Sequence, residues 1–279
     1  MRSSPLRSRR LPAAAPVLLL AALAIAAPAP AAEVSAKDVI RKMKEALEPP
    51  RPSLRAIRMT VREDGQKAEF RLLQARKGGE QGQRSLTVVV APPEARGLAY
   101  LVEEPAGGGP ATEHVYVPVV RRTRAFVPAE HHTAFLGSDL TYGDLGFIAV
   151  DSKDRLVGEG RHHGRPAYEV ESVPSSTIQQ WYYSKVVTWI DRETMLPIER
   201  AFYSPAGQVF KTETFAKVAH VDGIPTPLAI RVERAGSRSS TELEVTSISY
   251  GVEIPDGIFA PDRLASAVDR LEKLAERVP

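Results

Sequence analysis

The feature that most constrains this chain is a long series of short runs in which apolar and polar residues alternate. Ile57, Met59 and Val61 share one parity, and polar residues fill the positions between them. The Asp64-Gly65 pair that follows is typical of a two-residue hairpin turn. Similar runs recur up to Tyr250, and turn residues separate neighbouring runs. This pattern predicts sequential hairpins in one large, curved antiparallel sheet, because strand–helix–strand units would need helical runs between the strands.

The predicted strands follow from this alternation. They are Ile57–Val61, Phe70–Leu72, Leu86–Ala91, Leu98–Val102, His114–Val119, Arg121–Val127, Tyr168–Val173, Gln180–Ile190, Ile198–Tyr203, Val209–Phe215, Lys217–His220, Thr226–Glu233 and Thr241–Tyr250. In the last strand, Leu243 and Val245 have one parity, whereas Ile248 and Tyr250 have the other. A β-bulge near Ser247 would place all four side chains on the same face.

Two helices are expected to flank the sheet. Apolar residues recur at helical spacing from Val39 to Leu47, after Ser35 as a plausible N-cap. At the other end, Asp262–Val278 carries an apolar stripe, and Pro261 suits the first helical position. Packing on the sheet is the simpler interpretation of that stripe, and binding to a partner or a membrane surface is the alternative.

The first 32 residues have the three parts of a secretory signal peptide. Arginines precede a short apolar core, Val17–Ala26, and small residues follow at Ala29–Ala32. We therefore expect a signal peptide over residues 1–32 and a soluble, periplasmic mature chain; a retained N-terminal anchor is the alternative. A single domain over residues 33–260 and a C-terminal helix over 261–279 are expected to follow. Because the sequence has no cysteine, a lipid-anchored lipoprotein is excluded.

Composition excludes several other classes of protein. The absence of cysteine also excludes a disulfide scaffold and a cysteine nucleophile. The formal net charge is +3, but residues 1–32 contain four arginines and no acidic residue. Without them the chain is close to neutral, which argues against nucleic-acid binding.

Motifs for catalysis or metal binding are not evident. The sequence lacks a G-x-S-x-G elbow, an H-E-x-x-H motif and a phosphate-binding loop. Two pairs of adjacent histidines, His131-His132 and His162-His163, could in principle supply metal ligands. Adjacent side chains on a strand point to opposite faces, so we expect neither pair to chelate a metal and expect solvated loop histidines instead. We accordingly predict no catalytic residues, no metal and no cofactor.

Several segments resemble a known family. His114–Arg124 contains the pattern Y-x-P-x-x-R-R-x-R, and Phe135–Leu145 contains F-x-G-S-D-L-x-Y-x-D-L. Trp189–Pro197, Val221–Pro227 and Ile254–Phe259 add a W-I-D strand, a D-G turn and a closing I-P-D-x-x-F. In this order and spacing, the segments resemble the outer-membrane lipoprotein-sorting protein family over about residues 35–260.

The resemblance implies a fold and a binding function. The fold would be mainly β: a LolA-like half-barrel, in which helices cover the concave face of one strongly curved antiparallel sheet. A covered apolar face suits acyl chains, since each buried methylene contributes about 0.8 kcal/mol. We expect the cavity to be lined by apolar residues of the motif segments and of two strands, namely Val115, Val117, Phe135, Leu136, Leu140, Tyr142, Leu145, Phe147, Val187 and Trp189. Ordinary core packing is the alternative for the residues after the G-S-D turn.

The charged residues of the motif are open to more than one interpretation. Arg121, Arg122 and Arg124 would contact a lipid headgroup or a protein partner. Alternatively they solvate a sheet edge, or one of them pairs with Asp139 or Asp144 inside the fold. Gly137 and Ser138 complete the motif as turn residues.

The expected function is that of a periplasmic carrier or acceptor of lipid or lipidated protein. It would transport or sort cargo towards the outer membrane, with transient membrane contact and an inner-membrane transporter as a further partner. A lipid shuttle for an inner-membrane exporter and a regulatory module similar to the sensor RseB are the alternatives, followed by an unrecognised hydrolase.

Overall fold

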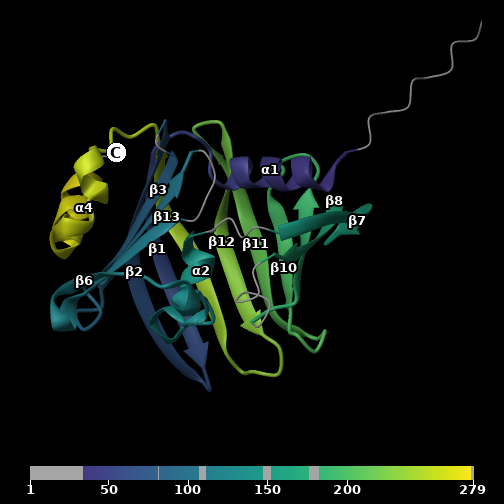
Figure 1. Cartoon of the computed structure of the whole chain (residues 1–279), viewed down its shortest axis with the longest axis horizontal. Helices are drawn as coiled ribbons and strands as arrows, with labels where there is room; N and C mark the ends of the chain where they lie inside the picture. The colour runs from purple at the N-terminus through teal and green to yellow at the C-terminus, as the bar shows by residue number, and fades with distance from the viewer. Residues whose placement is uncertain (1–33, 81, 107–110, 147–151, 176–181, 278–279) are drawn as a thin grey trace, which may run out of the picture. The chain divides into compact units, whose positions relative to one another are not determined.

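The computed structural model describes residues 34–80, 82–106, 111–146, 152–175 and 182–277, which belong to one compact unit, Val34–Pro279. The predicted signal peptide and Phe147 lie outside the described residues. One antiparallel sheet of 13 strands forms the body of this unit (Figure 1). The strands are β1 Ser53–Glu63, β2 Gln66–Gly79, β3 Gly82–Ala91, β4 Ala99–Pro105, β5 Thr112–Val117, β6 Arg122–Ala125, β7 Ser152–His162, β8 Arg165–Pro174, β9 Lys185–Asp191, β10 Pro197–Tyr203, β11 Val209–Val221, β12 Ile224–Arg234 and β13 Ser240–Tyr250.

The strand order confirms the predicted fold class. The sheet runs β6-β5-β4-β3-β2-β1-β13-β12-β11-β10-β9-β8-β7, so two meanders join where the first strand pairs with the last. β6 and β7 are the two edges, so the sheet is open, and its strands curve around the inner face (Figure 1). Few helices accompany it, which agrees with the expected LolA-like half-barrel.

Local irregularities explain how the strands differ from the predicted ones. The pairing of β1 with β13 steps from Ala56–Ser247 to Ile57–Val245, which confirms the predicted bulge near Ser247. The two strands predicted on either side of residue 216 form a single strand, β11, in which Lys217 has a positive φ of 53°. β7 was missed because Gly158 and Gly160, which weaken a strand pattern, lie within it.

The first strands of the sheet are covered on both faces. Side chains of consecutive residues point to opposite faces, so Leu72 and Val89 belong to one apolar cluster and Leu73 and Val88 to another. We call the face of Leu72 and Val89 the inner face. The covering segment, residues 126–146, lies over it and contains three short helices: Pro128–His132, Phe135–Gly137 and α2, Tyr142–Gly146.

Helix α1, Ala36–Leu47, covers the later strands of the inner face (Figure 1). The Ser35 side chain accepts a hydrogen bond from the backbone N–H of Asp38 (3.1 Å), which confirms the predicted N-cap. Val39, Met43 and Leu47 pack against a cluster of buried side chains from β8 to β11, namely Val170, Ile190, Leu196 and Phe215.

The C-terminal stripe packs on the outer face of the sheet. Residues Pro261–Ser266 form a 3-10 turn, and α4, Ala267–Ala275, continues from it. Leu264, Leu271 and Leu274 are buried in the cluster that contains Leu73 and Val88, which supports packing on the sheet over binding to a partner. Among the residues that the structure describes, no helix combines the length and hydropathy needed to cross a membrane.

Candidate functional site

Two neighbouring hollows lie between the inner face and its covers. The apolar chamber encloses about 870 Å³, including solvent space at its mouth. Its walls are aliphatic and aromatic side chains from the sheet and the covering segment, namely Ile57, Leu72, Leu140, Leu145, Phe215, Ala229, Ile230, Leu243 and Val245. Ile57, Ile230, Leu243 and Val245 remain only half-buried although they face inwards. This part of the inner face is therefore not filled by the protein's own side chains.

Polar groups gather at one part of the apolar chamber's wall. Arg55, Gln74 and Thr87 line it together with Tyr250. Gln74 and Thr87 satisfy each other through a 3.0 Å hydrogen bond. Arg55 donates one long hydrogen bond, 3.4 Å, to the Ser53 hydroxyl, and its buried Nε has no partner among the described residues. A guanidinium with free donors at an apolar cavity suits an anionic group on a ligand.

The second hollow, the polar chamber, lies between α1, the covering segment and β7–β11. It encloses about 1110 Å³, again including open solvent, and shares Leu47 and Asp144 with the apolar chamber. Charged and ring side chains line it, among them Lys44, His131, His132, Tyr182, Arg200 and Lys211. The His132 ring stacks on Tyr182 with centroids 4.1 Å apart.

The last helix of the covering segment starts with a local capping arrangement. The Asp144 carboxylate accepts hydrogen bonds from the Thr141 backbone N–H (2.6 Å) and hydroxyl (2.9 Å). This is one half of a capping box, with aspartate in place of the usual glutamate at the third helical position. It fixes the Asp144 carboxylate at the boundary of the two chambers, where it faces β11.

A buried ion pair connects Asp144 to the sheet. Lys211 Nζ lies 2.7 and 2.8 Å from the two Asp144 carboxylate oxygens, and the Lys211 side chain is 1% exposed. Burial raises the pKa of Asp144, but the Lys211 charge and the hydrogen bonds from Lys211 and Thr141 outweigh it, so the pKa lies below its ordinary value. Burial likewise lowers the pKa of Lys211, and the charges of Asp144 and Glu213 more than reverse this shift.

Two further charges extend this pair along the inner face. Glu213 lies 3.4 Å from Lys211 and 3.1 Å from Arg200. Burial raises the pKa of Glu213 above its ordinary value, since the two cations compensate it only in part. The four side chains form a charged cluster that joins the covering segment to β10 and β11.

Two more contacts hold the covering segment at other strands. Asp139 accepts hydrogen bonds from the hydroxyls of Ser239 (2.6 Å) and Thr241 (2.9 Å). His131 Nε2 lies 2.6 Å from Glu113 Oε1 on β5, and the Tyr100 hydroxyl bonds to the same carboxylate. The cover is thus attached by polar contacts at β5, β11 and β13, in addition to the apolar packing of Phe126, Phe135 and Leu145 against the sheet.

The structure separates the predicted cavity residues into two groups. Leu140 and Leu145 line the apolar chamber. Val115, Phe135 and Tyr142 lie in a packed cluster between the sheet and the cover. In this cluster the Tyr142 ring contacts those of Tyr100, Phe126 and Phe135 at centroid distances of 5.1, 4.8 and 5.3 Å. Val117 and Leu136 pack against this cluster and line neither chamber. For these five residues, core packing is the observed environment.

The parity predicted for β9 is corrected by the structure. Val186 and Thr188 line the polar chamber, and Ile190 packs against α1. Val187 and Trp189 alternate with them and therefore face the outer side, where Trp189 stacks on His162 with centroids 4.3 Å apart. Both faces of this strand carry apolar residues, which is why alternation did not identify the inner one.

The motif arginines do not pair with the aspartates of the motif. Asp139 lies 3.5 Å from Arg234, and Asp144 pairs with Lys211, so neither aspartate pairs with Arg121, Arg122 or Arg124. Arg124 instead forms two hydrogen bonds with Glu130, both 2.7 Å. All three arginines are exposed on or beside β6, an edge strand. Their place agrees with solvation of the edge and leaves them accessible to a partner.

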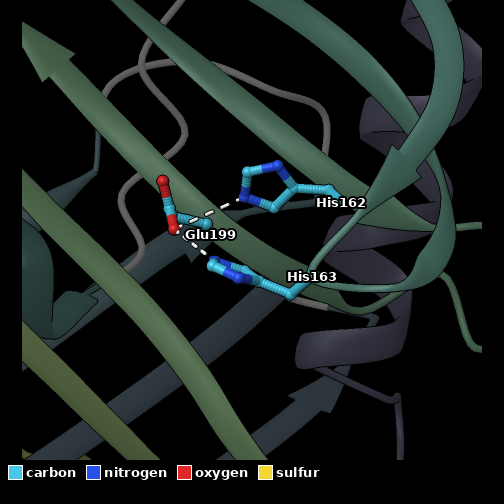
Figure 2. A group of neighbouring side chains, drawn as sticks. All are labelled: His162, His163 and Glu199. Atoms are coloured by element: carbon cyan, nitrogen blue, oxygen red, sulfur yellow. Dashed lines mark hydrogen bonds and ion pairs between the residues drawn. The ribbon is translucent and has the colours of Figure 1, made fainter.

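The prediction that the side chains of His162 and His163 point to opposite faces is wrong. His162 ends β7, and His163 lies in the following turn with a φ of 46°. Figure 2 shows both rings directed towards the Glu199 carboxylate of β10. Likewise, His131 and His132 are not solvated loop residues, since they contact Glu113 and Tyr182.

Sequence reasoning missed the charged cluster on β10 and β11. Lys211 and Glu213 have the same parity as the buried Phe215, and this spacing was the available signal. Charged residues are rarely fully buried, so such positions are normally assigned to solvent. Asp144, the partner that makes their burial possible, comes from a segment 67 residues away in the sequence.

Comparisons with known proteins agree with this architecture. A family model described as "Uncharacterized protein" matches residues 81–266. A DUF1329 family protein from Desulfovibrio piger is similar in structure, with a TM-score of 0.74, 25% identity, and coverage of 81% of this chain and 96% of that one. A comparison with curated protein sequences finds no match.

Two further solved structures carry names that relate to lipoprotein sorting. The first is a domain assigned by its name to the outer membrane lipoprotein-sorting proteins, from Vibrio parahaemolyticus (TM-score 0.73, 19% identity, 82% of this chain and 97% of that one). The second is a LolA superfamily protein from Nitrosomonas europaea (TM-score 0.66, 22% identity, 82% and 99%). At these identities the likeness establishes a common fold, the LolA-like half-barrel.

Proposed function

The chain belongs to the family whose model matches residues 81–266 and has the LolA-like fold, and on this basis we propose that it carries or accepts lipid in the periplasm. Its cargo is a lipid or the acyl chains of a lipoprotein, on the way towards the outer membrane. The unfilled apolar chamber is the observation that supports this proposal most strongly. The proposed role is non-enzymatic, because binding and release alone fulfil it.

The energetics of the apolar chamber suit a transported acyl chain. Burying a chain of about 16 methylenes gains on the order of 10 kcal/mol before the costs of association. Its lining is mainly apolar with a few polar groups such as Arg55 and Gln74, as is usual for sites that bind small apolar ligands. A carrier must also release its cargo, and opening the cover would break its polar contacts with β11 and β13 and part of its apolar packing on the sheet. Arg55 would pair with the carboxylate or phosphate of the cargo.

A titration with a fluorescent fatty acid tests the proposed function. The wild-type protein should bind it at about one molecule per chain with a Kd on the order of 1 μM, and unlabelled acyl lipid should displace it. Saturable binding supports an acyl-chain site. A folded protein that leaves the fluorescence of the probe unchanged over the whole titration would contradict it.

The β5–β6 connection is suited to transient contact with a membrane. Val119 and Val120 at its tip are 86% and 59% exposed, although both side chains are apolar. Arg121 and Arg122 follow them directly, and Arg124 is close by on β6. Apolar side chains next to cations match the interface of an anionic membrane. We propose that this tip contacts the membrane, or an inner-membrane transporter, during loading and unloading.

Replacing Arg121, Arg122 and Arg124 with Ala should weaken binding to anionic vesicles at least tenfold, since each arginine near such a surface contributes about 1 kcal/mol. Sedimentation with phosphatidylglycerol-containing vesicles measures the effect. The thermal midpoint should stay within a few degrees, because the three side chains are exposed. As a matched control, Arg62, Lys67 and Lys217, exposed on other strands, are replaced with Ala. Equal losses in both triple variants would mean that the tip has no special role.

A further inference from the structure

A second cluster of ligand-type side chains lies on the outer face, away from both chambers. His162 and His163 come from the tip of the β7–β8 hairpin and Glu199 from β10 (Figure 2). His163 Nε2 lies 2.8 Å and His162 Nε2 3.4 Å from the same oxygen, Glu199 Oε2. One ligand atom from each residue lies within 4.8 Å of the other two. The three side chains thus converge on one point.

The turn explains why two consecutive histidines converge. His163 and Gly164 have φ values of 46° and 78°, the left-handed conformation of a tight hairpin turn. His163 is therefore outside the alternation of the strand, and its ring folds back over His162, with ring centroids 4.4 Å apart. His163 is thus a non-glycine residue at positive φ, a conformation that is uncommon for such residues.

The spacing is that of metal ligands. In a tetrahedral site with metal–nitrogen and metal–oxygen bonds of about 2.0–2.1 Å, neighbouring ligand atoms are about 3.4 Å apart. The His162–Glu199 separation of 3.4 Å matches this value, and the His163–Glu199 separation of 2.8 Å is shorter, so a small rotation of the exposed His163 side chain away from Glu199 would complete the geometry.

The surroundings of His162 support a ligand role. Its ring stacks on Trp189 with centroids 4.3 Å apart and an interplanar angle of 7°, which fixes the ring plane. His162 Nε2 is buried and has no hydrogen-bond partner among the described residues, although it points towards Glu199. The Glu199 side chain is 18% exposed, whereas His163 is 57% exposed, so the cluster is open to solvent on one side. Neighbouring charges are already paired, Arg192 with Glu159 and Arg165 with Asp191.

We propose that His162, His163 and Glu199 bind one divalent transition-metal ion such as Zn²⁺, with water at the open position. Two imidazoles and one carboxylate are ligands typical of zinc, copper or nickel, whereas calcium and magnesium prefer oxygen ligands throughout. The ion would join the β7–β8 hairpin to β10 across two intervening strand pairings and stabilise the β7 edge of the sheet. Because the site is on the outer face, metal binding is independent of the acyl-chain site.

Calorimetric titration of tag-free protein with ZnCl₂ tests this proposal. We expect one ion per chain for the wild type, and at least a tenfold loss of affinity in each of His162→Gln, His163→Gln and Glu199→Gln. His220→Gln is the matched control, because His220 is an exposed histidine on β11 outside the cluster, and it should retain wild-type affinity. Excess Zn²⁺ should also raise the thermal midpoint of the wild type and of His220→Gln, but not that of His163→Gln.

Two results would overturn the metal site. One is a wild type whose affinity for Zn²⁺ equals that of His163→Gln, the most exposed and hence least disruptive of the three replacements. The other is a loss of affinity in His220→Gln as large as in the cluster variants, which would indicate adventitious binding to surface histidines. Far-UV circular dichroism verifies that each variant is folded, so that a loss of binding reports on the ligands.

Discussion

Replacing Lys211 with Met should destabilise the protein by about 3–5 kcal/mol, because it leaves the buried Asp144 carboxylate without its cation. Lys211 is 1% exposed and bonds to both oxygens of Asp144, so its removal takes the cation from both oxygens at once. For a domain of this size, the loss corresponds to a fall in thermal midpoint of roughly 10 °C. Thermal unfolding measures it, and faster hydrogen exchange in residues 126–146 would locate the change in the covering segment.

The double variant Lys211→Met/Asp144→Asn is the control for this interpretation. It removes both charges while keeping a side-chain oxygen for the Thr141 hydrogen bonds. We expect its free energy of unfolding to be at least about 2 kcal/mol higher than that of Lys211→Met, since an uncompensated buried charge costs more than a missing pair. If both variants were equally unstable, or if Lys211→Met were as stable as the wild type, the proposed attachment of the cover by this pair would be wrong.

The same pair gives the wild type a characteristic pH dependence. The pKa of Asp144 lies below its ordinary value of 3.8 in the folded protein, so its stabilisation is complete above the unfolded pKa. As the pH falls through the lowered folded pKa, the carboxylate becomes protonated and this contribution is lost. The double variant should lack this component of the acid transition.

Much of the fold follows from local sequence patterns. The alternation of Ile57, Met59 and Val61, the Asp64-Gly65 turn and the change of parity around Ser247 each depend on a few neighbouring residues. These features therefore identify strands, turns and a bulge without knowledge of the partner strands. The helices at both ends were predictable for the same reason, because a cap and an apolar stripe are also local.

The site depended on long-range contacts that a local pattern does not contain. The inner face of β9 could not be identified because Val187 and Trp189 on one face are as apolar as Val186 and Ile190 on the other. Lysine is normally exposed to water, so an inward-facing Lys211 is not expected from the sequence of β11 alone. Its burial is explained by the ion pair with Asp144 of the covering segment. The convergence of His162 and His163 depends on a left-handed turn residue that no general rule for strands anticipates.

A Leu243→Trp variant should lose acyl-chain binding while remaining folded. Leu243 faces Met59 and Ile230 across the neighbouring strands and lines the apolar chamber, where it is only half-buried. The larger indole would occupy the empty volume instead of displacing packed neighbours. In a filled core the same replacement would cost about 1–3 kcal/mol. We therefore expect a change of thermal midpoint of no more than a few degrees and at least a tenfold loss of affinity for the fluorescent fatty acid.

The neighbouring residue provides the matched control for this replacement. Glu242 lies one position earlier on β13, faces outwards and pairs with Arg231 at 3.1 Å in an exposed ion pair. Glu242→Trp adds the same ring to the outer side of the strand, and an exposed pair contributes little to stability. It should bind the probe as tightly as the wild type. If it lost binding equally, a general effect of tryptophan on β13 would explain the result.

Native mass spectrometry after incubation with phospholipid vesicles tests the central claim most directly. Wild-type protein and the Leu243→Trp variant are incubated side by side with excess vesicles, separated from them without detergent and sprayed under non-denaturing conditions. If the apolar chamber is an acyl-chain site, the wild type will carry one lipid mass per chain and Leu243→Trp will carry none. A wild type without bound lipid, or a lipid load that is equal in the two proteins, would contradict the claim.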